Sequence, residues 1–361
     1  MIPESPARAR LLRGGGALAL ALALLGATGP QARAASPSPS PAPLRLPVLP
    51  LRVDTSSGTC TKGSSTVMKQ VPWAQGVLGL SRAALHGDGA GVTVGVVDTG
   101  VAAKAGVLSG RVSAQRGADG DCVGHGTFMA GLIAGAPRDG VAFTGVAPGA
   151  RIYSARGTDA GGTADASLVA NGIRAAVDAG CRVVVVAAAL PASTAALRDA
   201  VRHAAERDVL LVAPAVPDDS DATSGDQQAV ADFYPAASPG VLSVADFGPD
   251  GSRATRAALP SGVDLAAPGD QLTGPGPSGP GHFLGSGASL AAAYTAGAAA
   301  LLRARYPHLS ASETARRLVR SGYPADPPRL DLNGALTGVL PAPGDHVSAA
   351  PAPPLRVRRL G

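Results

Sequence analysis

Short apolar runs alternate with longer amphipathic runs through the middle of the chain. Residues 92–97, 182–186 and 209–212 are nearly uninterrupted runs of valine and leucine. Runs of this kind are expected for parallel strands that are covered on both faces. Residues 164–179 and 193–207 instead carry their apolar side chains along one helical face. This alternation predicts an α/β fold in three layers, with a doubly wound, mostly parallel sheet between helices on both faces.

The first residues have the pattern of a secretory signal peptide. Arginines precede the apolar run at 17–25, and the small-residue site Ala32-Arg33-Ala34 follows it. The run is much shorter than the roughly 20 residues that span a bilayer. No later stretch reaches 18 uninterrupted apolar residues, so no membrane span is predicted in the mature chain. We therefore expect residues 1–34 to be cleaved after Ala34 and the protein to be secreted, with attachment to the cell envelope left open.

Proline divides the rest of the chain. Residues 35–72 are interpreted as a proline-rich linker and N-terminal extension, of which 35–50 should not pack because alternating prolines prevent regular hydrogen bonding. Residues 73–333 are predicted to form one folded domain. Residues 334–361 are again proline-rich and are predicted to be a disordered tail.

Composition excludes two classes of protein. With 361 residues, 45% hydrophobic and 16% charged, the chain can bury a sizeable core and is not a small disulfide-stapled scaffold. Its net charge of +5 includes four arginines against one glutamate in residues 1–34. The remainder has no basic cluster with interleaved aromatic residues, so no nucleic-acid partner is predicted.

Three motifs place a polar residue where a strand is expected to end or a helix to begin. Asp98 ends VTVGVVD, His125 lies between glycines in GHGTFMAGLIAG, and Ser289 begins the alanine-rich GASLAAAYTAGAAALL. Ligands of doubly wound sheets bind outside the carboxyl ends of the strands. An imidazole can transfer protons, and a helix start stabilises negative charge. Each residue alone also fits a structural role, as a turn aspartate, a structural histidine or an N-cap serine.

Taken together, in this chain order, the three residues resemble the triad of the subtilisin-like serine peptidases. The likeness runs from about Trp73 to about Asp331 and includes GVAPGARIYSAR, FYPAASPGVLSV and VDLAAPG. It implies a polypeptide substrate and no cofactor. Asp98 would orient the imidazole, His125 would act as general base and then acid, and Ser289 would be the nucleophile. The backbone amide of Ser289 would donate to the oxyanion.

A narrower likeness is to the mycosins, the subtilisin-like peptidases of actinobacterial type VII secretion systems. It is carried by the signal peptide, an extension containing Cys60, the phrase VPWAQGVLGL, Cys122 just before the histidine motif, and the proline-rich tail. It implies secretion-complex components as partners. It also favours a disulfide between Cys60 and Cys122, which leaves Cys181 as a small buried hydrophobic residue.

Three departures from the family pattern bear on chemistry, one of them being GASLAAA in place of Gly-Thr-Ser-Met-Ala-Ala-Pro around the nucleophile. The stretch that should read Ala-Ala-Gly-Asn reads APAV, which places Val216 at the position of the oxyanion-binding asparagine, and the substrate-binding edge Ser-Leu-Gly appears as Ala187, Ala188 and Ala189. Loss of one oxyanion donor lowers kcat about 10²- to 10³-fold, a value measured in a subtilisin. The sequence therefore predicts a serine endopeptidase of reduced activity. The alternative is a catalytically inactive relative with a structural or binding role in a type VII secretion complex.

No metal site is predicted. No histidine stands at ligand spacing from the cysteines. An acidic loop after Pro217 offers carboxylates for calcium, but a solvated loop is the favoured interpretation; its members are Asp218, Asp219, Asp221 and Asp226.

Overall fold

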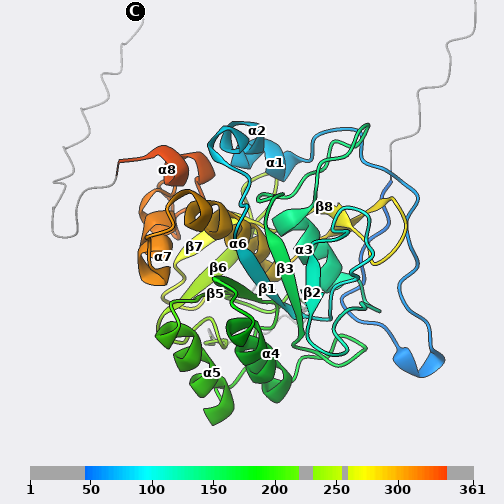
Figure 1. The fold of residues 1–361 in the computed structure, drawn as a ribbon, viewed down its shortest axis with the longest axis horizontal. Coiled ribbons are helices and arrows are strands. Elements are labelled where there is room, and N and C mark those ends of the chain that lie inside the picture. The colour runs from blue at the N-terminus through cyan, green and yellow to red at the C-terminus, as the bar shows by residue number, and fades with distance from the viewer. Residues whose placement is uncertain (1–44, 219–230, 254–258, 340–361) are drawn as a thin grey trace, which may run out of the picture. The chain divides into compact units, whose positions relative to one another are not determined.

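A seven-stranded parallel sheet forms the centre of the domain (Figure 1). The computed structural model describes residues 45–218, 231–253 and 259–339. Within them the strand order is β2-β3-β1-β4-β5-β6-β7, and each neighbouring pair is parallel. The strands are β1 (Thr93–Asp98), β2 (Val112–Ala114), β3 (Arg151–Arg156), β4 (Val183–Val186), β5 (Leu210–Pro214), β6 (Val241–Phe247) and β7 (Leu265–Pro268). A separate antiparallel hairpin pairs β8 (Leu272–Pro275) with β9 (His282–Gly285).

Helices cover both faces of this sheet. On one face α4 (Ala166–Asp178) and α5 (Ala195–Glu206) lie side by side, at the bottom of Figure 1. On the other, α3 (His125–Ala134) packs against α6 (Ala288–Arg305), and α7 (Ala311–Arg320) follows. The short helices are α1 (Trp73–Leu78), α2 (Leu80–Ala83) and α8 (Leu332–Thr337), with 3₁₀ turns η1 (Thr55–Ser57) and η2 (Ala84–His86). The predicted three-layer α/β architecture is confirmed.

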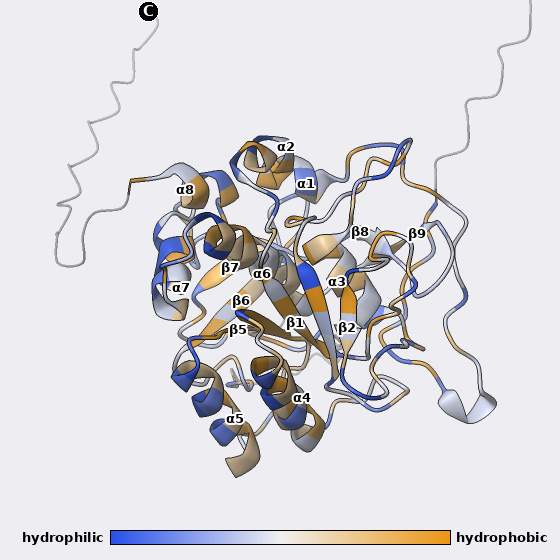
Figure 2. Ribbon diagram, viewed as in Figure 1, coloured by the Kyte–Doolittle hydropathy of each residue, from blue (hydrophilic) through white to orange (hydrophobic). Residues whose placement is uncertain are grey.

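The central strands are hydrophobic on both faces because each face has its own core. In β1, Val94 and Val96 join the cluster under α3 and α6, whereas Val97 joins the cluster under α4 and α5. Figure 2 shows the resulting pattern, with hydrophobic inner strands and hydrophilic residues on the outward sides of α4 and α5. Alternating burial on two faces explains why the valine runs are continuous rather than periodic.

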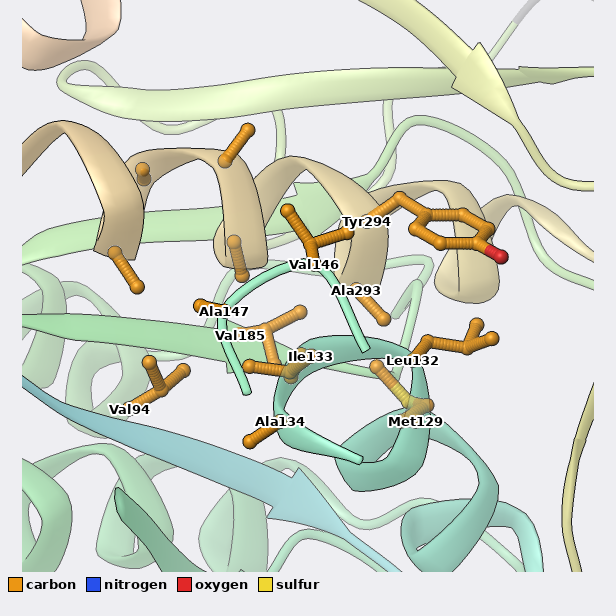
Figure 3. Packing of buried hydrophobic residues seen from close by; sticks show 14 of the residues in the cluster. Val94, Met129, Leu132, Ile133, Ala134, Val146, Ala147, Val185, Ala293 and Tyr294 are labelled. Atoms are coloured by element: carbon orange, nitrogen blue, oxygen red, sulfur yellow. The ribbon is translucent and has the colours of Figure 1, made fainter. Parts of the chain in front are cut away.

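Helix α6 crosses the larger core almost completely buried. Its alanines are small, so the helix axis can lie close to the sheet. Figure 3 shows how Ala293 and Tyr294 of α6 pack with Met129 and Ile133 of α3. This packing holds the N-terminal ends of both helices, where His125 and Ser289 lie, in one rigid layer.

The prediction that residues 35–50 do not pack is wrong for residues 45–50. Leu46 and Leu49 are buried, and the Leu49 amide donates to the Leu284 carbonyl at 2.8 Å while the Leu284 amide donates to the Pro47 carbonyl at 2.8 Å. Leu46 and Leu49 supply the apolar side chains, and the Leu49 amide and the Pro47 carbonyl pair with Leu284, so this segment adds to the edge of β9. Residues 35–44 lie outside the described residues.

The predicted tail also begins too early. Helix α8 extends to Thr337, and Leu336 is buried because it continues the apolar face of Leu332. Residues 340–361 lie outside the described residues, as do residues 1–34. In the part of the chain that is described, no helix has the length and apolar character needed to cross a membrane.

Candidate active site

Asp98 is the last residue of β1, at the carboxyl end of the sheet. The residue is 2% exposed. An isolated carboxylate there would be strongly disfavoured, and its Oδ2 lies 2.6 Å from Nδ1 of His125. The pair makes Nδ1 the protonated ring nitrogen and leaves Nε2 directed toward Ser289.

His125 is the first residue of α3, and glycines on both sides let it lie there. Gly124 takes a left-handed conformation with φ of 100°. A Cβ on Gly126 would lie 2.1 Å from the Gly100 carbonyl oxygen, so only glycine lets α3 begin so close to the end of β1. The histidine is 6% exposed.

Asp121, which the sequence analysis did not single out, fixes the loop before the histidine. Its carboxylate accepts hydrogen bonds from the amides of Gly124 at 2.7 Å and Thr127 at 2.8 Å, and from the hydroxyls of Thr99 and Thr127. Burial nevertheless raises the pKa of Asp121. The four donors form a cradle that sets the orientation of the first turn of α3.

Ser289 is the second residue of α6 and is fully buried. Its Oγ lies 3.1 Å from Nε2 of His125. The structure thus brings Asp98, His125 and Ser289 into one hydrogen-bonded line, with the serine amide at the positive end of a helix of 18 residues. This arrangement can activate a hydroxyl nucleophile and stabilise negative charge beside it.

Asp218 is the second residue that the sequence analysis missed at this site. Its Oδ1 accepts a hydrogen bond from the Ser289 amide at 2.9 Å, and its Oδ2 accepts one from the Ser289 hydroxyl. The same Oδ2 lies 3.6 Å from Nε2 of His125. The only signal in the sequence was the acidic run after Pro217, which was weighed as a calcium loop.

Val216 stands at the sequence position of the oxyanion-binding asparagine, but its side chain does not reach the active-site pocket. Val216 is fully buried and does not line the active-site pocket, whereas Pro217 and Asp218 do. The reason lies in the strand before it. The Ala215 amide still pairs with the Val244 carbonyl at 2.8 Å, so the chain leaves the core later than the motif suggests.

Two carboxylates set the charge of His125. Burial lowers the pKa of the imidazole, but the attraction of Asp98 and Asp218 outweighs burial, and the pKa of His125 is held well above its usual value. Both carboxylates therefore favour the protonated form of the ring, which is not the form that acts as a base.

The pocket beside the triad is lined by residues from several parts of the chain. Ala187, Ala188 and Ala189, which the sequence analysis interprets as the substrate-binding edge, follow β4 and line this pocket. Leu51 and Arg52 of the N-terminal extension line the same pocket, which the sequence analysis did not anticipate. An extended chain entering this pocket would meet small alanine side chains as well as charged ones, among them Arg52 and Asp218.

The cysteines are arranged as expected. Cys60 and Cys122 form a disulfide, and the Thr61 amide donates to the Cys122 carbonyl at 2.9 Å, so the extension is joined to the loop that precedes His125. Cys181 is a buried free thiol whose pKa burial raises to about 12. It therefore behaves as a small hydrophobic residue.

No group of three or more metal-ligating side chains occurs among the described residues. Of the acidic loop, only Asp218 is described. Asp219, Asp221 and Asp226 lie outside the described residues.

Comparisons with known proteins agree with this geometry. Residues 89–335 match the Subtilase family. Mycosin-3 of Mycobacterium tuberculosis is 33% identical over 354 residues, covering 78% of this chain and 75% of that protein. Subtilisin Savinase of Lederbergia lenta is 32% identical over 255 residues, covering 67% of this chain and 87% of that protein.

Solved structures give the same result. The MycP3 protease from the type VII (ESX-3) secretion system matches with a TM-score of 0.65 at 30% identity, covering 78% of this chain and 94% of that one. MycP1 with its N-terminal propeptide removed matches with a TM-score of 0.65 at 27% identity, covering 76% and 99%. Fold and relatives together define a subtilisin-like serine peptidase. The chain belongs to the subtilase family, and within that family it is mycosin-like.

Proposed function

We propose that this protein is an exported serine endopeptidase that hydrolyses peptide bonds with Asp98, His125 and Ser289. The observation that carries the proposal is the hydrogen-bonded line from the Asp98 carboxylate through both ring nitrogens of His125 to the Ser289 hydroxyl, at 2.6 Å and 3.1 Å. All three groups are buried, which strengthens their mutual interactions.

The roles follow from this geometry. Neutral His125 takes the hydroxyl proton at Nε2 while Oγ of Ser289 attacks the peptide carbonyl carbon, and Asp98 stabilises the imidazolium that forms. The Ser289 amide, at the start of α6, donates to the carbonyl oxygen as negative charge develops there. His125 then returns the proton to the leaving amine, and water hydrolyses the acyl-enzyme by the same path. The residues 187–189 form the edge against which the substrate lies.

The proposed activity is low in the resting enzyme. Asp218 occupies the Ser289 amide and hydroxyl, and the raised pKa of His125 disfavours the neutral base. Export follows from the signal pattern in residues 1–34, with cleavage after Ala34. Components of a type VII secretion complex are proposed partners because the mycosin relatives include proteases from such systems.

A second candidate function is a structural or binding component of such a complex without catalysis. The specific observation in its favour is again Asp218, since a carboxylate on the nucleophile and its amide blocks both from substrate. The two functions differ in whether Ser289 reacts.

A fluorophosphonate probe reports the activation of Ser289 directly. We expect covalent labelling of the mature protein, loss of labelling in Ser289→Ala and His125→Ala, and a fall in peptide hydrolysis toward the roughly 10⁶-fold loss found for triad residues in a subtilisin. Ser312→Ala, an exposed serine of α7, is the matched control and should label like wild type.

Equal labelling of wild type and Ser289→Ala would rule out this serine as the nucleophile. Full complementation of a deletion strain by Ser289→Ala, with no hydrolysis by the wild-type protein, would establish the structural function instead.

A further inference from the structure

The side chain of Asp218 lies where the carbonyl oxygen of a substrate would have to lie. An oxyanion site is defined by the donors that point into it, and here the Ser289 amide donates to Oδ1 of Asp218 at 2.9 Å. The side chain is 11% exposed, so the carboxylate is almost completely withdrawn from water. Gly287 leaves room for it, because a Cβ at that position would lie 2.3 Å from the Asp218 carboxyl carbon.

The two protonation states of this carboxyl group have opposite effects. The ionised group has only acceptors, so it can fill the site but cannot donate to a substrate, and its charge opposes the developing oxyanion. The protonated group carries an O–H. A neutral carboxylic acid in an apolar site is an effective oxyanion donor, as ketosteroid isomerase shows.

We propose that Asp218 is the oxyanion-site residue of this peptidase: protonated, it donates a hydrogen bond to the carbonyl oxygen of the bound peptide, and ionised, it fills the oxyanion site and suppresses hydrolysis. The inference rests on the proposed function, because it assigns a residue to that reaction. Asp218 takes the place that the sequence analysis assigned to Val216, whose side chain has no hydrogen-bond donor.

The proton that Asp218 needs is already in the site. A serine hydroxyl has one proton, and that of Ser289 is donated to Asp218, so the 3.1 Å contact with His125 places an Nε2 proton facing Oγ. If the Ser289 proton passes to Asp218 while the Nε2 proton passes to Oγ, the products are a carboxylic acid, a hydroxyl directed at Nε2 and a neutral imidazole. No proton enters or leaves. The carboxylic acid and the neutral imidazole that the reaction needs are thereby both formed within the site.

Charged groups from every neighbouring element lie near the Asp218 carboxyl group. His125 at the start of α3 and the amide end of α6 face it, and Arg52 of the extension lines the same pocket. Asp98 at the end of β1 and Asp121 beside it are the nearby acidic groups. Oδ2 of Asp218 lies 3.6 Å from Nε2 of His125, so the charge of each group affects the other.

The pair predicts a bell-shaped dependence of kcat on pH. At low pH both groups are protonated and the base is lost. At high pH both are deprotonated, so the base is present but the ionised Asp218 fills the oxyanion site. Activity is confined to the window in which the pair holds one proton.

The test compares wild type, Asp218→Asn and Asp218→Ala from pH 5 to pH 10. Asp218→Asn supplies a permanent donor and should raise kcat about 10- to 1000-fold, with a rise to a plateau and no alkaline decline. Asp218→Ala removes both the block and the donor. It should exceed wild type at alkaline pH, fall below wild type at acid pH, and stay below Asp218→Asn throughout.

A second measurement does not depend on turnover. Titration of the His125 ring protons by NMR should give a lower pKa in Asp218→Asn than in wild type, because one of the two carboxylates beside the ring has gone. An unchanged His125 titration would overturn the proposal even if the variants were inactive.

The outcomes separate the two proposals. Ser289-dependent hydrolysis with parallel pH profiles in wild type and Asp218→Asn would overturn the role of Asp218 and leave the peptidase standing. No Ser289-dependent hydrolysis or fluorophosphonate labelling in any of the three proteins would overturn the peptidase and, with it, the role of Asp218.

Discussion

At the scale of single residues, His125 is the most tightly constrained group in the site. One ring nitrogen lies 2.6 Å from Asp98 and the other lies 3.6 Å from Asp218. A triad with a single carboxylate holds the imidazole in one tautomer. A second carboxylate beside Nε2 favours the protonated ring, so Asp218 opposes the neutral form of His125 that catalysis needs.

The position of Val216 gives a test of where the oxyanion side chain lies. Because Val216 is fully buried, Val216→Asn would place an unpartnered amide in the core and should lower the free energy of unfolding by about 2–4 kcal/mol. It should not raise kcat. Denaturant unfolding and peptide hydrolysis measure the two effects.

Val216→Ala is the matched control, since it removes volume without adding a polar group and should be the milder change. A rise in kcat for Val216→Asn without loss of stability would show that position 216 faces the substrate after all.

The residues of the site differ in how well the sequence alone predicts their positions. Asp98, His125 and Ser289 each stand at a strand end or helix start, a place that the local pattern marks. Asp218 does not stand at a place that the local pattern marks, because its position depends on how far β5 continues its pairing with β6. The Ala215 amide reaches Val244, a partner 29 residues away in the chain, and local sequence carries no record of that contact.

At the scale of elements, the approach of α3 to the end of β1 determines the distance between base and carboxylate. The backbones of Gly126 and Gly100 approach each other closely there. A Cβ on Gly126 would also come within 3.3 Å of Oδ2 of Asp98. The glycines on both sides of His125 are thus required by packing. They let α3 begin in close contact with the backbone at the end of β1.

Gly126→Ala should therefore push α3 away from β1 and lower kcat more than 10-fold, because a misplacement of about 1 Å can cost 10²-fold. It should also destabilise the fold by about 1–3 kcal/mol. Fluorophosphonate labelling rates and thermal unfolding measure both effects.

Gly76→Ala in α1 is the control, because a Cβ there meets no atom within 4 Å. It should leave labelling unchanged and be neutral or stabilising by up to about 1 kcal/mol, as expected for a glycine inside a helix. Equal labelling rates for the two variants would show that close packing at Gly126 does not control the triad.

Elements with a strong local pattern were predictable, and those defined by their neighbours were not. The strands β1, β4 and β5 are apolar runs and lie within a residue or two of their predicted places. The pairing of residues 45–50 with β9 escaped prediction because the prolines obscure the one amide, of Leu49, and the one carbonyl, of Pro47, that form its hydrogen bonds. Tertiary contact, not propensity, orders that segment.

At the scale of the whole molecule, the N-terminal extension connects parts of the domain that are distant in sequence. It pairs with Leu284, is bonded to Cys122, and donates from the Met68 amide to Nδ1 of His282 at 3.1 Å. The extension therefore contributes to the stability of the domain as well as to the wall of its pocket.

His282 makes this contribution dependent on pH. The residue is fully buried, its Nδ1 is held as an acceptor, and burial, with Arg138 nearby, lowers its pKa to about 4. In the unfolded chain a histidine has a pKa of about 6.5. Between these values the unfolded state binds a proton that the folded state refuses, so stability is complete above about pH 6.5 and is lost as the pH falls toward 4.

We expect this group to contribute a loss on the order of 2 kcal/mol across that window, somewhat less than the full shift would give. The measurement is the free energy of unfolding in urea at intervals from pH 7 to pH 4.5, for wild type and His282→Phe. The variant loses the acceptor for Met68 and should be less stable at pH 7, but its stability should fall less steeply with acid. His308→Phe, which replaces an exposed histidine, should keep the wild-type slope. Because all other titrating groups act equally in the three proteins, identical slopes for wild type and His282→Phe would mean that the contact between the extension and β9 does not sense pH.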